Sequence, residues 1–152
     1  MDRFLLVLVL AAVAVAIALF VQRRRPDAPT PARAEYRAPA RLEREDFERP
    51  EAPWLVAVFT SSACGSCDEV WSKAVVLDSD QVAVQQIEVS RDPDLHRRYG
   101  VDAVPIIAIA AADGTVSSSC VGPVSSTHLW AAVAELRAPG SVPPGCSGHV
   151  DT

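Results

Sequence analysis

Two cysteines, Cys64 and Cys67, follow an uninterrupted apolar run from Trp54 to Thr60. Such a run is typical of a strand that is buried on both faces. From Cys64 to Leu77, apolar residues recur at three- and four-residue intervals, which predicts a helix with one buried face. The sequence therefore predicts that both cysteines lie at a strand-to-helix turn, with Cys64 at the helix N-terminus and Cys67 on the buried face.

This placement gives the two thiols different roles. The dipole and the free N–H groups of a helix N-terminus favour a thiolate, so we expect the pKa of Cys64 to lie below that of a free cysteine. Cys64 would then attack a disulfide, and Cys67 would resolve the mixed disulfide. The alternatives are a purely structural pair, or half of a zinc site completed by Cys146 and His149. The strand-to-helix setting favours redox chemistry, with no metal and no cofactor.

Strand and helix signals alternate after the dithiol. We expect strands at 82–89, 105–111 and 116–121, a helix at 93–99, and a last helix that begins near 125–127 and includes Leu136. A strand–helix–strand unit needs a parallel crossover, whereas the Asp113-Gly114 turn signal indicates an antiparallel hairpin. The pattern predicts an α/β fold with a mixed central sheet flanked by helices.

Between roughly Leu42 and Arg137 the chain resembles the thioredoxin superfamily. The segment Tyr99-Gly-Val-Asp-Ala-Val-Pro105 looks like the loop that precedes the family's cis-proline. Asp113-Gly114 and Val121-Gly122 fall at the family's hairpin turn and at the glycine after its last strand. The resemblance implies a thioredoxin fold.

The same resemblance implies functional residues. Cys64 would be the catalytic nucleophile and Cys67 the resolving cysteine. Val104-Pro105 would form a cis peptide bond against Cys64, with the Val104 backbone pairing with an extended substrate. The alternative for Pro105 is an ordinary trans proline that opens a strand. Protein thiols and disulfides are the implied substrates.

Three residues depart from the family's pattern. Ala63 stands where the family usually has a Trp, Val58 replaces its buried acid, and Gln86 replaces the Lys beside that acid. In the family the buried acid helps the second cysteine lose its proton. These departures keep open an alternative function, a thioredoxin-like binding or assembly module with a vestigial or regulatory dithiol. We expect the other polar candidates to be surface residues of helices: Asp68, Glu69, His96 and His128.

The N-terminus contains an apolar segment. Residues 4–21 lack charge, and as a helix they would reach about 27 Å, close to the hydrocarbon core of a bilayer. A buried core helix is the alternative, but the segment has no polar face. A cleaved signal peptide is less consistent with Arg23-Arg24-Arg25, which directly follows the apolar run. We therefore expect an uncleaved transmembrane helix and a single-pass protein of the cell membrane.

Charge bias predicts the orientation. One Arg, Arg3, precedes the apolar segment and three follow it, so the domain is expected on the cytoplasmic side. Cys120 and Cys146 are a possible second disulfide, which would persist only in an oxidising compartment. Bonding of this pair would favour the extracytoplasmic side, so both alternatives remain open.

The distribution of Pro, Gly and Arg residues predicts the boundaries of the linker, the domain and the tail. Residues 22–40 form a Pro- and Arg-rich linker, residues 41–138 the thioredoxin-like domain, and residues 139–152 a flexible Gly/Pro-rich tail. A net charge of -5 argues against nucleic acid as a partner. The sequence thus predicts a membrane-tethered, monomeric thiol–disulfide oxidoreductase.

Overall fold

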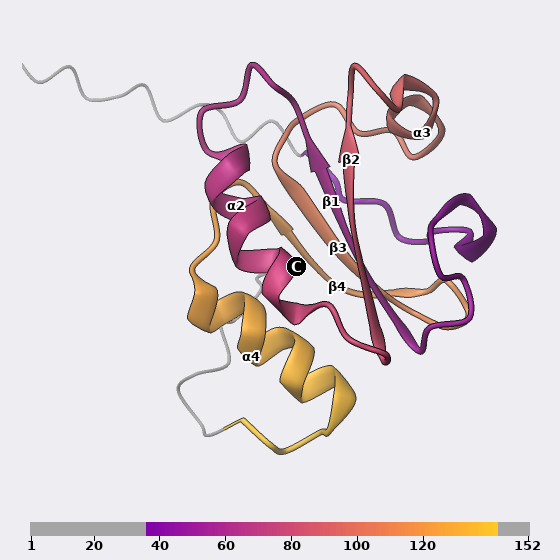
Figure 1. Cartoon of the computed structure of the whole chain (residues 1–152), viewed down its shortest axis with the longest axis vertical. Helices are drawn as coiled ribbons and strands as arrows, with labels where there is room; N and C mark the ends of the chain where they lie inside the picture. Colours follow the sequence, from indigo (N-terminus) through magenta and orange to yellow (C-terminus); the bar gives the residue numbers. More distant parts are fainter. Residues whose placement is uncertain (1–35, 143–152) are drawn as a thin grey trace, which may run out of the picture. The chain divides into compact units, whose positions relative to one another are not determined.

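The computed structural model describes residues 36–142 of the chain (Figure 1). The predicted transmembrane helix at 4–21, most of the linker and the tail beyond residue 142 lie outside the described residues. Within residues 36–142, no helix has both the length and the apolar character needed to span a bilayer.

The elements follow the predicted order. The strands are β1 (Trp54–Thr60), β2 (Val82–Glu88), β3 (Ile106–Ala111) and β4 (Val116–Val121). The helices are α2 (Cys67–Ala74), α3 (Pro93–Arg98) and α4 (Ser126–Arg137), with short 3-10 turns at η1 (Arg44–Asp46) and η2 (Val75–Leu77). The main difference from expectation is at the helix after β1, which begins at Cys67 rather than at Cys64.

The described strands form one mixed sheet in the order β2-β1-β3-β4. β1 is parallel to β2 and antiparallel to β3, and β3 pairs antiparallel with β4. The central position of β1 explains why its apolar run is continuous, since six of its seven residues are buried. The predicted mixed sheet is confirmed.

Side chains alternate between the two faces of the sheet, and each face has its own core. Helices α2 and α4 cover one face, where Val58 and Ile107 pack against Val70 and Leu129 (Figure 1). On the other face, Phe59 and its neighbours pack against residues of the segment before β1 (36–53) and against residues of α3. Helix α2, which begins at Cys67, therefore packs on a buried apolar layer that fixes its position.

The described segment before β1, residues 36–53, is held against the sheet by the buried guanidinium group of Arg44. Arg44 is 5% exposed and donates hydrogen bonds to the carbonyl oxygens of Ala111, Arg49 and Ala52 at 3.0–3.3 Å. Its removal from water lowers the pKa of Arg44. In the same segment, Leu42 N–H donates a hydrogen bond to the carbonyl of Gly114. Position 114 requires glycine, because its φ is +83° and a Cβ atom there would clash with the Leu42 backbone.

The exposed edge of the sheet at β2 is blocked by side chains. Asp78 accepts a hydrogen bond from Val84 N–H at 3.1 Å, and the Arg91 guanidinium donates to the carbonyl of Gln86 at 3.1 Å. Charged groups on an edge strand prevent further strands from pairing with it. This edge is therefore protected against strand addition.

Candidate functional site

The two cysteines of the predicted dithiol are joined by a disulfide bond, with their Cα atoms 5.5 Å apart. Cys64 is partly exposed, whereas Cys67 is 2% exposed. Cys64 is therefore the more accessible of the two cysteines. This asymmetry suits an outer attacking cysteine and an inner resolving cysteine.

The dithiol loop is a tight turn that precedes the helix. Cys64 N–H donates to the carbonyl of Ser61 at 3.0 Å, and Cys67 N–H donates to the carbonyl of Cys64 at 3.3 Å. The expectation that α2 starts at Cys64 is corrected by three residues. The reason is local: the backbone turns at Ser61–Cys64 before the first α-type hydrogen bond, from Val70 N–H to Ser66 C=O.

The hydroxyl of Ser66 is the polar side chain in contact with the outer sulfur. Its Oγ lies 3.8 Å from Cys64 Sγ, within the range of a sulfur hydrogen bond. When the disulfide is reduced, this hydroxyl can donate to a Cys64 thiolate. Hydrogen bonding to the charged form of an acid stabilises that form, so Ser66 is placed to stabilise a thiolate at Cys64.

The predicted cis peptide bond is present at Val104–Pro105. The register pairs Ile106 with Phe59, so Pro105 lies at the end of the sheet where β1 runs into the dithiol loop. Pro105 itself is buried, and its carbonyl accepts a hydrogen bond from Gly122 N–H at 2.8 Å. The proline loop and the dithiol loop thus share one edge of the domain.

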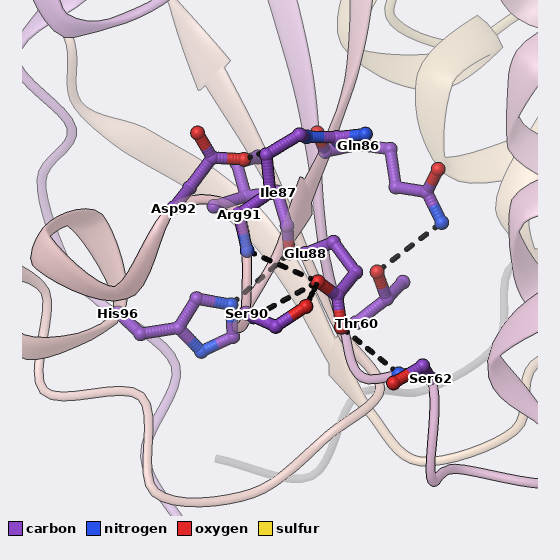
Figure 2. Close-up of polar contacts among 9 residues, drawn as sticks. All are labelled: Thr60, Ser62, Gln86, Ile87, Glu88, Ser90, Arg91, Asp92 and His96. Carbon is purple, nitrogen blue, oxygen red and sulfur yellow. Dashed lines mark hydrogen bonds and ion pairs between the residues drawn. The ribbon is translucent and has the colours of Figure 1, made fainter.

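Strands β1 and β2 carry a neutral polar pair near their C-terminal ends. Val58 is fully buried, and its partner across the sheet is Gln86. The amide of Gln86 donates to the hydroxyl of Thr60 at 3.2 Å, and Thr60 is 1% exposed (Figure 2). The positions that hold an acid and a lysine in the resembled family therefore carry an apolar residue and an amide. Asp68 and Glu69 are exposed, as predicted.

A carboxylate that the sequence analysis did not single out joins two loops at this edge. Glu88, the last residue of β2, accepts a hydrogen bond from Ser62 N–H at 2.9 Å (Figure 2). Its other oxygen accepts from Ser90 N–H at 2.9 Å and Arg91 N–H at 3.2 Å, and from the Ser90 hydroxyl. The ends of adjacent parallel strands meet at one edge. That rule would have placed Glu88 beside the dithiol loop.

The two histidines differ from one another. His128 is exposed, as predicted. The expectation of a surface position is wrong for His96, which is 5% exposed. Its Nε2 forms a hydrogen bond with the carbonyl oxygen of Ile87 at 3.0 Å, and its ring packs edge-on against the Phe59 ring, with the centroids 5.3 Å apart. Helix α3 is only six residues long, too short for a periodic pattern to identify its buried face.

Cys120, on the edge strand β4, is partly buried and has no disulfide partner within residues 36–142. Burial raises the pKa of Cys120, which makes it a poor nucleophile near neutral pH. Its proposed partner Cys146 lies outside the described residues. The pairing of these two cysteines therefore stays a prediction.

Comparison with known proteins identifies the fold. A family model described as thioredoxin matches residues 41–135. Among curated sequences no match was found. A solved mutant thioredoxin from Halobacterium salinarum is 27% identical, with a TM-score of 0.45 over 53% of this chain and 71% of that one. A structure described as a malarial protein is 19% identical, with a TM-score of 0.49 over 54% of this chain and 94% of that one.

Proposed function

This chain belongs to the thioredoxin family, and we propose that it is a thiol–disulfide oxidoreductase that works through Cys64 and Cys67. The observation that carries the proposal is the disulfide itself, between a partly exposed and a buried cysteine at a strand-to-helix turn. The dithiol loop follows the same end of β1 that lies beside the cis Val104–Pro105 loop.

The proposed reaction is a reversible exchange of two electrons and two protons. The Cys64 thiolate attacks a substrate disulfide, a Cys64–substrate disulfide forms, and one substrate thiolate leaves. Cys67 then loses its proton and attacks Cys64 Sγ, which forms the Cys64–Cys67 disulfide and releases the second substrate thiolate. The substrate disulfide is reduced to a dithiol and the protein dithiol is oxidised. A dithiol donor restores the reduced protein by the same steps in reverse.

The backbone of Val104 is the proposed substrate-binding group. It lies directly before Pro105, on the loop that meets the end of β1. A main-chain N–H and C=O beside the reactive sulfur can pair with an extended peptide without selecting its side chains. Protein disulfides or dithiols in extended segments are therefore the proposed substrate class.

A binding or assembly module is the second candidate. Fully buried Val58 and the neutral Gln86–Thr60 pair favour it, because neither offers a group that takes a proton from Cys67 at neutral pH. In such a module the dithiol would be vestigial or regulatory. The two candidates differ in turnover, since a module binds its partner without exchanging electrons.

Insulin reduction separates the two candidates. The purified full-length chain, supplied with dithiothreitol, should reduce insulin faster than the Cys64→Ser variant. Equal rates would eliminate the enzyme function. The Cys67→Ser variant is a companion test, because its Cys64 should remain covalently attached to substrates in cells. The double variant Cys64→Ser/Cys67→Ser is the matched control for this trapping.

We also propose that residues 4–21 tether the domain to the cell membrane as a single span, with the domain in the cytoplasm. The support is the uncharged run and the three arginines that follow it. Tags at the two ends, probed by protease in intact cells, test the topology. Cleavage of the N-terminal tag and protection of the C-terminal tag agree with it, whereas the opposite pattern places the domain outside.

A further inference from the structure

Glu88 forms a bridge between the dithiol loop and the loop after β2. One carboxylate oxygen accepts the N–H of Ser62, two residues before Cys64, at 2.9 Å. The other oxygen accepts N–H groups of Ser90 and Arg91 at 2.9 and 3.2 Å. Figure 2 shows these contacts converging on the single carboxylate. The position of the dithiol loop therefore depends on this side chain.

The charge of Glu88 is held by hydrogen bonds but is not neutralised. Its partners are backbone N–H groups and a hydroxyl, and the hydrogen bonds from Ser90 and Ser62 keep the pKa of Glu88 below its usual value. Glu88 has no ion pair within residues 36–142. The neighbouring Arg91 guanidinium is turned away, toward Asp92 and the carbonyl of Gln86.

This fixed anion lies beside the loop that carries Cys64. Two residues of chain span at most about 7 Å, so a carboxylate bonded to Ser62 N–H stays within about 10 Å of the Cys64 backbone. At such a distance, two like charges at a protein surface repel each other measurably. The other acids near the site, Asp68 and Glu69, are exposed on α2, and Glu69 is paired with Lys73.

We propose that Glu88 is a positioning residue that holds the Cys64 loop and, through its charge, disfavours the Cys64 thiolate and so biases the Cys64–Cys67 couple toward the disulfide. A couple biased in this way gives up its electrons more readily, so the residue makes the protein a better reductant and a poorer oxidant. This inference rests on the proposed function, because it concerns the poise of the same couple.

The test compares three variants of the full-length chain in redox equilibrium with glutathione. Glu88→Gln has nearly the same shape and removes the charge; its amide oxygen can still accept from Ser62, but its amide nitrogen no longer accepts from Ser90 and Arg91. Glu88→Asp keeps the charge. Asp113→Asn is the matched control. Asp113 also accepts hydrogen bonds from a turn, at Thr115 N–H and Oγ, but it lies at the opposite end of the sheet.

Glu88→Gln should increase the ratio of dithiol to disulfide at a fixed glutathione poise by about three- to tenfold. For a two-electron couple this ratio corresponds to a potential about 15–30 mV more positive. The pKa of the Cys64 thiol, measured by the pH dependence of alkylation, should fall in parallel. Glu88→Asp should remain close to the wild type, and Asp113→Asn should be unchanged.

Three results would overturn the inference without contradicting the proposed function. One is a wild type that reduces insulin while Glu88→Gln has the wild-type equilibrium and thiol pKa. Another is an equal shift in Glu88→Gln and Asp113→Asn, which would indicate a general effect of losing a turn contact. A shift of Glu88→Asp as large as that of Glu88→Gln would show that charge is not the cause. A wild type without any exchange would instead refute the proposed function.

Discussion

Replacement of Tyr99 by Phe should remove a pH-dependent contribution to stability. The Tyr99 hydroxyl accepts a hydrogen bond from Glu43 N–H at 3.1 Å and donates one to the carboxylate of Asp46. The same ring packs against Phe47 at 5.7 Å. These contacts join the segment before β1 to the start of the loop that leads to Pro105.

The size of the effect follows from the ionisation of the phenol. Burial, followed by the hydrogen bond to Asp46, raises the pKa of Tyr99 to about 12, against about 10 in the unfolded chain. A group with a raised folded-state pKa stabilises the protein fully below its unfolded pKa and loses that contribution as the pH rises. Two pH units correspond to about 2.7 kcal/mol, which partial exposure of the ring reduces to about 2 kcal/mol.

Urea unfolding of the wild type and Tyr99→Phe, at several pH values from 8 to 12.5, measures this difference. Near pH 8 the variant should be less stable by about 1–2 kcal/mol, because two hydrogen bonds are lost. From about pH 10 to 12 only the wild type should lose about 2 kcal/mol through this group, so the gap should close and Tyr99→Phe should become at least as stable as the wild type. Tyr36→Phe, which alters a 51% exposed ring, should parallel the wild type. A gap that is constant from pH 8 to 12 would refute the reasoning.

Three further outcomes follow from individual contacts. Ser66→Ala should raise the pKa of the Cys64 thiol in the reduced protein, because the thiolate loses a hydrogen bond; the pH dependence of alkylation measures this, and an unchanged profile would contradict the role of Ser66. Arg44→Ala should lower the free energy of unfolding by about 2–4 kcal/mol, because one buried and two partly buried carbonyl groups lose their donor; a free energy of unfolding within about 0.5 kcal/mol of the wild type, measured with urea, would refute this role of Arg44. Cys120 should resist iodoacetamide in the folded protein at pH 8 and react after unfolding, followed by peptide mass spectrometry; rapid labelling of the folded chain would show that burial does not protect it.

The strands could be predicted because buried strands contain runs of apolar residues that are visible in the local sequence. β1 is buried on both faces, so its apolar run from Trp54 marked it without any alignment. The turn at Asp113-Gly114 and the N-cap at Ser125, whose side chain accepts from His128 N–H, were equally local signals. The cis peptide bond at Pro105 followed from the resemblance alone, since no local pattern distinguishes it from a trans proline.

The features that sequence reasoning missed depend on packing between distant segments. His96 is buried because α3 folds against Phe59, 37 positions earlier in the chain. Glu88 acts on Ser62 across 26 positions, and Arg44 on Ala111 across 67. The start of α2 was misplaced because the turn at Ser61–Cys64 is stabilised by contacts that composition does not reveal. Local patterns thus located the two bonded cysteines, whereas the residues around them could be identified only from the folded structure.

The central claim is that Cys64 and Cys67 form a reversible redox couple, and a glutathione titration of the full-length chain tests it most directly. The fraction of disulfide, read by trapping free thiols at each poise, should follow one two-electron transition that is lost in Cys64→Ser. The same curve should be reached from the oxidised and the reduced protein. A disulfide that fails to equilibrate across the glutathione range, or a transition that persists in Cys64→Ser, would contradict the account.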